Sequence, residues 1–161
     1  FISRRVEFRV PVYLDYALNS FNDQDVLFYE RFNVTPLLSP ELSLSEMAEF
    51  KNKDVVILCH GDIALMNTLI QLEDKELIDE KGLVFPVRKE DSYWQILNSR
   101  PFGMFNDILK VHGAGFNQFF IDKQGRGAHF TALYRNILKG GIADRKKRKG
   151  YTAGHLYRPV G

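Results

Sequence analysis

Runs of apolar residues that end in polar clusters recur along this sequence. We expect a buried strand at each run, a further strand at Val10–Leu14, and amphipathic helices between several of them. Buried strands with polar groups at their C-terminal ends are typical of parallel α/β proteins, in which those ends share one edge and carry the site. The strands and their polar clusters are Val34–Leu38 with Ser39-Pro40-Glu41, Val55–Cys59 with His60-Gly61-Asp62, Gln95–Leu97 with Asn98-Ser99, and Phe116–Ile121 with Asp122.

Capping residues mark the start of two predicted helices. Ser43 and Glu46 have the spacing of a capping box and predict a short helix that ends near residues 51–53. Asn22 is a candidate N-cap for a helix over Asp23–Phe32. Two further helices are predicted, one after Pro101 with the apolar face Phe102, Phe105, Ile108 and Leu109, and one with the apolar face Phe130, Leu133, Tyr134, Ile137 and Leu138.

An insertion over residues 71–91 interrupts this alternation. Lys75–Asp79 and Leu83–Arg88 are predicted to form a β-hairpin that turns at residues 80–82, and Pro86 suits an edge strand. The preceding segment, Gly61–Leu72, fits either a short helix or an extended strand. Residues 1–140 are therefore interpreted as one α/β unit with this insertion, and residues 141–161 as a basic loop and a C-terminal tail.

The composition is that of a globular protein with one core. The chain has 161 residues, of which 45% are hydrophobic and 26% are charged. No apolar run approaches the roughly 18 residues that span a bilayer, so no membrane partner is expected. A single cysteine excludes an internal disulfide framework and points to a reducing, cytoplasmic compartment. This cysteine and four histidines without ligand spacing predict no iron–sulfur cluster, no structural zinc and no other cofactor.

Positive charge is concentrated near the C-terminus. The net charge is +2, but five of the 22 basic residues form the run Arg145, Lys146, Lys147, Arg148 and Lys149. The remaining 17 basic residues face 20 acidic ones, a balance of −3. The run is either a solvated loop or a phosphate contact for RNA. No aromatic residue interleaves with it, so base stacking is not indicated there.

Several short phrases resemble those of one protein family. The sequence is similar to the collagenase-like peptidases, a family of peptidases of unknown catalytic type, over nearly its whole length. The resemblance implies a TIM-type (β/α) barrel, of which this chain would be the C-terminal part, and a hydrolase that acts on a peptide or small molecule. The phrases, in chain order, are Asp15-Tyr16-Ala17-Leu18-Asn19, Leu38-Ser39-Pro40-Glu41-Leu42, Gly82-Leu83-Val84-Phe85-Pro86-Val87, Asn98-Ser99, Tyr134-Arg135 and Thr152-Ala153-Gly154-His155.

One departure from the family pattern opens a second interpretation. Family members that hydroxylate RNA or ubiquinone precursors carry several cysteines for an iron–sulfur cluster in the interval that corresponds to Asp62–Lys81, and here that interval has none. Cys59 alone cannot hold a cluster. The alternative is therefore a non-catalytic binding or accessory subunit of such a hydroxylation system that has lost the cluster cysteines.

The strand-end pattern supplies the candidate site residues. Glu41, His60 and Asp122 are candidate catalytic residues, and Asn98 and Ser99 are candidate ligand-binding residues. Each also has a structural interpretation, since Glu41 precedes a helix, His60 suits a buried hydrogen bond, and Asn98-Ser99 suits a helix cap. If the strands are parallel, Glu41, His60, Asn98 and Asp122 meet on one rim.

Familiar protease motifs are missing. The sequence has neither His-Glu-x-x-His nor Gly-x-Ser-x-Gly. Cys59 beside His60 is disfavoured as a nucleophile and its base, because adjacent strand residues point to opposite faces.

A partial barrel has consequences for assembly. TIM barrels typically need about 250 residues, and an open half-barrel leaves an unpaired strand edge. The first residue, Phe1, is not an initiator. We therefore expect that additional N-terminal chain completes the barrel or that the chain self-associates.

Overall fold

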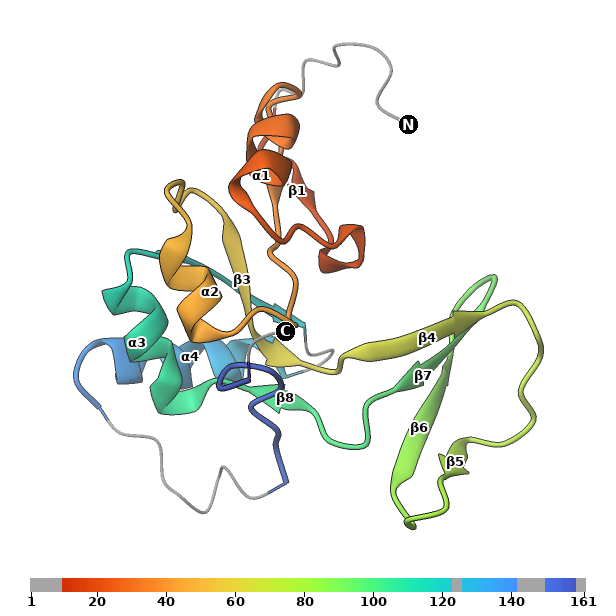
Figure 1. Ribbon diagram of the computed structural model, residues 1–161. Helices are drawn as coiled ribbons and strands as arrows, with labels where there is room; N and C mark the ends of the chain where they lie inside the picture. The colour runs from red at the N-terminus through yellow and green to blue at the C-terminus, as the bar shows by residue number, and fades with distance from the viewer. Residues whose placement is uncertain (1–9, 123–125, 142–149, 159–161) are drawn as a thin grey trace.

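The computed structural model describes residues 10–122, 126–141 and 150–158 (Figure 1). These residues form a mixed α/β fold with nine strands in three sheets, four α-helices and two short 3-10 helices. The sheets do not close into a barrel. The run Arg145–Lys149 lies outside the described residues, so its interpretation as an RNA contact stays a prediction.

Four parallel strands lie side by side in the same order as in the chain, although other strands separate the last two in sequence. β1 (Tyr13–Leu14) pairs with β2 (Thr35–Pro36), and β3 (Val56–Gly61) pairs with β9 (Gln118–Asp122). A parallel bridge between Leu37 and Val56 joins the two pairs. Every residue of β3 is buried, as expected for a central strand of a covered parallel sheet. These four strands, β1-β2-β3-β9, are called the parallel layer below.

The helices start where their capping residues predict. Asn22 caps α1 (Asp23–Glu30) by accepting hydrogen bonds from two backbone N–H groups of the first turn. The predicted capping box is confirmed for α2 (Leu44–Glu49), because the Glu46 carboxylate accepts from the Ser43 backbone N–H at 2.8 Å and the Ser43 hydroxyl accepts from Glu46. The predicted final helix is confirmed as α4 (Gly127–Leu138), which buries Phe130, Tyr134 and Ile137.

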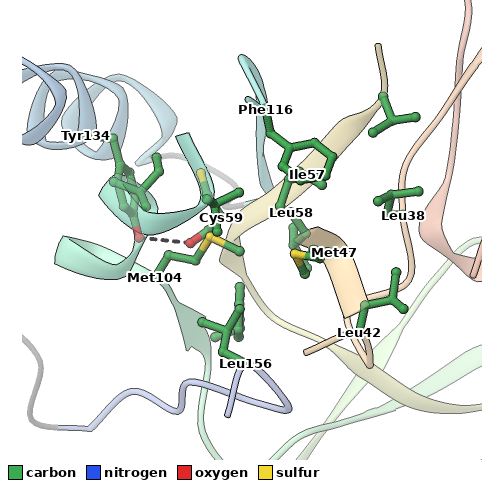
Figure 2. Close-up of a cluster of buried hydrophobic side chains, with 14 of the residues drawn as sticks. Leu38, Leu42, Met47, Ile57, Leu58, Cys59, Met104, Phe116, Tyr134 and Leu156 are labelled. Carbon is green, nitrogen blue, oxygen red and sulfur yellow. Dashed lines mark hydrogen bonds between the residues drawn. The ribbon is translucent and has the colours of Figure 1, made fainter. Parts of the chain in front are cut away.

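The core lies between the parallel layer and the helices. α2, α3 (Ile108–Gly113) and α4 pack in sequence beside β3 (Figure 1). Figure 2 shows Ile57 and Leu58 of β3 surrounded by side chains from these helices and from the loops. Leu156 of the C-terminal tail also enters this core, and its carbonyl accepts from the Leu44 backbone N–H at 2.9 Å. The tail is thereby fixed next to the start of α2.

The insertion is larger than residues 71–91 and forms its own antiparallel sheet. Its strands are β4 (Ala64–Thr68), β5 (Glu76–Ile78), β6 (Val84–Lys89) and β7 (Trp94–Leu97), in the spatial order β4-β7-β6-β5. The predicted hairpin is confirmed as β5–β6. The expectation of an edge strand at Pro86 is wrong, because β6 lies between β5 and β7; Pro86 itself precedes the residues of β6 that pair with β7. This sheet projects from the rest of the molecule (Figure 1).

Two predicted elements are wrong. Gln95–Leu97 is not a strand of the parallel layer, because β7 pairs antiparallel with β4 and β6. The helix predicted directly after Pro101 begins only at Ile108, because Phe102–Gly103 form the short strand β8 against His60–Gly61 and residues 105–107 form the 3-10 helix η2. The helical spacing of buried Phe102, Phe105 and Ile108 thus arises from three different elements.

Candidate functional site

A cavity of about 660 Å³ opens where the C-terminal ends of the parallel layer meet the inserted sheet. It is lined by the 3-10 helix η1 (Tyr16–Leu18) and its flanks, the loop after β2, the end of β9, three strands of the insertion and the tail. Its polar lining residues include Asp15, Tyr16, Asn19, Ser39, Glu41, Asn67, Arg88, Glu90, Tyr93, Gln95, Asn98, Asp122 and His155.

Three of the predicted site residues share this cavity. Glu41 follows β2 and is exposed, whereas Asp122 at the end of β9 and Asn98 after β7 are half-buried. They are distant in sequence and come from different elements. Parallel strands bring Glu41 and Asp122 to one edge as predicted, but Asn98 arrives from the inserted sheet. Ser99, although described and half-buried, is not part of the lining.

His60 does not reach the cavity, contrary to the expectation that it shares the rim. Its side chain is fully buried, its ring stacks on Phe130 with 3.7 Å between centroids, and its Nδ1 lies 3.2 Å from the Tyr134 hydroxyl. The register between β3 and β9 shifts between Leu58 and His60, which is the mark of a bulge. A bulge changes the face to which the next side chain points, and sequence alternation alone does not reveal it. His60 therefore belongs to the core below the cavity.

Tyr16 is a cavity residue that the strand-end pattern missed. Tyr16 and Ala64 of β4 both line the cavity. Burial raises the pKa of Tyr16, and the nearby carboxylates of Asp15 and Asp122 raise it further. The hydroxyl is therefore protonated at neutral pH and available as a hydrogen-bond donor. The strand-end pattern that identified Glu41 could also have identified Asp15–Asn19, since Asp15 directly follows the strand predicted at Val10–Leu14.

Arg88 brings a positive charge from the insertion. Its Nε lies 2.7 Å from Glu90 Oε1, and its Nη2 donates to Gln95 Oε1 at 2.6 Å. These contacts hold the guanidinium against the sheet and neutralise Glu90. Sequence analysis assigned Arg88 only to a hairpin, because nothing local shows that this hairpin faces the strand ends of a different layer.

The charge balance of the cavity is acidic. Beside the Arg88–Glu90 pair, the carboxylates of Asp15 and Glu41 add negative charge at the opening, and Asp122 adds a further carboxylate to the lining. One Asp15 oxygen accepts from the Ala17 backbone N–H at 2.8 Å, which fixes η1 at the cavity wall. Carboxylates beside a protonated tyrosine suit proton transfer, and they attract a positively charged ligand.

Cys59 lies in the core of β3 and not in the cavity. Its side chain is fully buried, and its Sγ donates to the Phe120 carbonyl at 3.2 Å. Burial raises the pKa of the Cys59 thiol to about 12 from an ordinary value of 9.0. A thiol that stays protonated and shielded from solvent is a poor nucleophile. This agrees with the sequence analysis, in which Cys59 is disfavoured as a nucleophile.

We expect the Cys59 thiol to resist a thiol reagent at pH 8 in the folded protein and to react fully once denaturant is added. Because its folded-state pKa is the higher one, its contribution to stability is present below pH 9.0 and is lost as pH rises toward 12. Labelling followed by mass spectrometry checks the first point, and denaturant unfolding between pH 8 and 10 checks the second. Rapid labelling of the folded chain would contradict this placement.

Comparison of the chain with protein-family models, with curated proteins and with solved structures found no match. None of the helices in the described part of the chain is both long and apolar enough to span a membrane. The described residues also contain no group of three or more histidine, cysteine, aspartate or glutamate side chains arranged to hold a metal ion.

Proposed function

We propose that this chain is a member of the collagenase-like peptidase family and that its parallel layer is part of a TIM-type barrel. The observation that carries the proposal is the cavity lining. Four of the phrases on which the resemblance rests are far apart in sequence and contribute to the same cavity: Asp15–Asn19, Leu38–Leu42, Asn98-Ser99 and Thr152–His155. Shared family phrases that meet in one place are more informative than any of them alone.

The other face of the parallel layer supports the barrel. An apolar hollow of about 470 Å³ is lined by side chains from or beside all four parallel strands, including Leu14, Leu37, Val56 and Phe120. The inside of a (β/α) barrel is lined by such alternating apolar side chains. Phe120 is 38% exposed, so this face is open for the rest of a barrel, whether from additional chain or from another copy.

The proposed chemistry uses residues around the opening of the cavity. Glu41 or Asp122 removes a proton from a water molecule that attacks the carbonyl carbon of a peptide bond, and the Tyr16 hydroxyl donates a hydrogen bond to the carbonyl oxygen as it gains negative charge. The same carboxyl group then returns the proton to the amide nitrogen as the C–N bond breaks, so that the products are a carboxylic acid and an amine. Asn98 offers an amide that orients a peptide or small-molecule ligand. His60 has no part in this mechanism because it lies in the core.

The position of His60 favours a second candidate function. With His60 and Cys59 both in the core, the described lining of the cavity contains no cysteine, and the groups in it suit binding as well as catalysis. The second candidate is a binding or accessory subunit of an RNA- or ubiquinone-precursor-hydroxylation system. It predicts ligand affinity without turnover.

Glu41→Gln and Asp122→Asn test the two functions. If these carboxylates act as acid or base, each variant should lower the hydrolysis rate of a fluorescence-quenched peptide library by about 100-fold. The melting temperature of Glu41→Gln should stay nearly unchanged, because the Glu41 side chain is exposed. Glu49→Gln on α2 is the matched control, since Glu49 is exposed and outside the cavity lining.

The results separate catalysis from binding. Turnover by the unaltered protein that each variant loses supports the enzyme, whereas absence of turnover in the unaltered protein, with weaker ligand binding in both variants, supports the binding subunit. A Glu41→Gln protein that unfolds more easily but keeps its specific activity would show that Glu41 is structural.

A further inference from the structure

β4 is an edge strand that carries neither charged residues nor proline, although its register with β7 shifts between Ala64 and Met66. In the described part of the chain, β4 pairs with β7 on one side and with no strand on the other. Edge strands are normally guarded by charged residues or proline, which prevent further strand pairing. The segment Ile63–Leu72, which contains β4, has no charged residue and no proline. At the opposite edge of the same sheet, β5 carries Glu76 and is flanked by Lys75 and Asp79.

Apolar side chains are exposed along this edge. Leu65 and Met66 of β4 are 55% and 56% exposed, and Leu69 and Ile70, just beyond the strand, are 86% and 74% exposed. Neighbouring apolar side chains exposed to this extent mark an interaction surface. Burying them against apolar side chains of another extended segment would remove this surface from water.

The edge is continuous with the cavity. Ala64, Leu65 and Asn67 of β4 line it. A segment that lies along β4 therefore passes the cavity, where the carboxylates of Asp15 and Glu41 favour a positive charge.

We propose that the β4 edge binds an extended peptide by strand addition and directs a positively charged group of that peptide into the cavity. The proposal rests on the proposed function of the cavity and names its ligand. Main-chain hydrogen bonds to β4 supply affinity, and the apolar surface and the acidic cavity supply specificity. A second copy of this chain paired through β4 fits less well, because its Ile63–Leu72 segment brings no positive charge to the cavity.

Three synthetic probes with a C-terminal fluorophore test this binding mode by fluorescence polarisation. The first is Lys-Val-Thr-Val-Thr-Val with a free amino terminus, the second is the same peptide with alternate backbone nitrogens methylated, and the third is the dipeptide Lys-Val. We expect the hexapeptide to bind at least about tenfold more tightly than the other two, because both lack main-chain hydrogen bonds of the added strand.

Variants of the protein identify the edge. Met66→Lys should weaken hexapeptide binding by about tenfold, while the dipeptide is little affected. Ile78→Lys on β5 is the matched control, since Ile78 is 70% exposed on the opposite edge and the charge change is the same. It should leave both affinities unchanged. Glu41→Gln should weaken both probes, because it removes a negative charge from the cavity lining.

Results that differ from these expectations would each contradict a specific part of the proposal. Equal affinity for the methylated and unmethylated hexapeptides, or equal loss from Met66→Lys and Ile78→Lys, rules out strand addition at β4 and leaves the cavity function in place. Binding that depends on the edge but is unaffected by Glu41→Gln supports strand addition at β4 and contradicts the role of the cavity. No binding of any probe, with a dimer in sedimentation that Met66→Lys dissociates, makes a second copy the occupant.

Discussion

Gly61→Ala is expected to lower the free energy of unfolding by about 2–4 kcal/mol. Gly61 ends β3, where it pairs with Asp122 of β9. A Cβ atom at this position would lie 2.7 Å from the Asp122 carbonyl oxygen and 2.8 Å from Asp122 Cβ. Both contacts are with the neighbouring strand rather than with a flexible side chain, so β3 and β9 must move apart. The change would also displace Asp122 from the cavity.

Gly113→Ala is the matched control for this prediction. Gly113 ends α3, and a Cβ atom there meets no heavy atom within 4 Å. Alanine favours the helix over glycine, so this variant should be neutral or more stable by up to about 1 kcal/mol. Chemical denaturation of both variants gives the comparison. Equal stability of Gly61→Ala and the unaltered chain would mean that the two strands do not approach as closely as described.

Tyr134→Phe is expected to cost about 2–4 kcal/mol of stability, because it removes one buried hydroxyl that serves several groups. The hydroxyl donates to the Cys59 carbonyl at 2.9 Å (Figure 2), accepts from the Phe105 backbone N–H at 3.2 Å, and lies 3.2 Å from His60 Nδ1. Phe105 has a φ of 42°, which is unfavourable for a residue with a bulky side chain. Without the hydroxyl, this turn retains its backbone strain but loses the hydrogen bond that the Phe105 N–H donates.

Tyr157→Phe provides the control with the same chemical change at the surface. Tyr157 is 57% exposed, and its hydroxyl contacts Asp107 and Lys110, which water can solvate in its place. Its loss should alter stability by no more than about 0.5 kcal/mol. Thermal and denaturant unfolding of both variants measures the difference. If the two tyrosines prove equivalent, the buried hydroxyl does not stabilise the turn at Phe105.

These two predictions concern residues that support the cavity from below, whereas Glu41 lies in the cavity lining and is exposed. Gly61 is the last residue of β3 and pairs with Asp122, and the Tyr134 hydroxyl donates to the carbonyl of Cys59 in the same strand. The position of Asp122 depends on this end of β3. Their variants should therefore lose stability and activity together. Glu41→Gln should lose activity alone, which distinguishes a group that reacts from groups that hold the site in shape.

Some features of this protein follow from short stretches of sequence. The capping box of Ser43 and Glu46, the cap at Asn22, the apolar face of α4 and the β5–β6 hairpin all appear where predicted. Each depends on contacts between residues that are near one another in the chain, so local composition is sufficient. The strand-end rule works for Glu41 and Asp122 because parallel strands align their ends whatever lies between them.

The remaining features of the fold and of the cavity are determined by tertiary structure alone. The apolar run at Gln95–Leu97 resembles a parallel strand in isolation, and only its pairing with β4 and β6 makes it part of the inserted sheet. A one-residue bulge in β3 accompanies the placement of His60 in the core, and a bulge is set by the partner strand. Arg88 and Tyr16 meet in one cavity because two separate layers face each other. Pairing, bulges and the facing of layers are contacts between distant segments, which no local pattern of apolar and polar residues specifies.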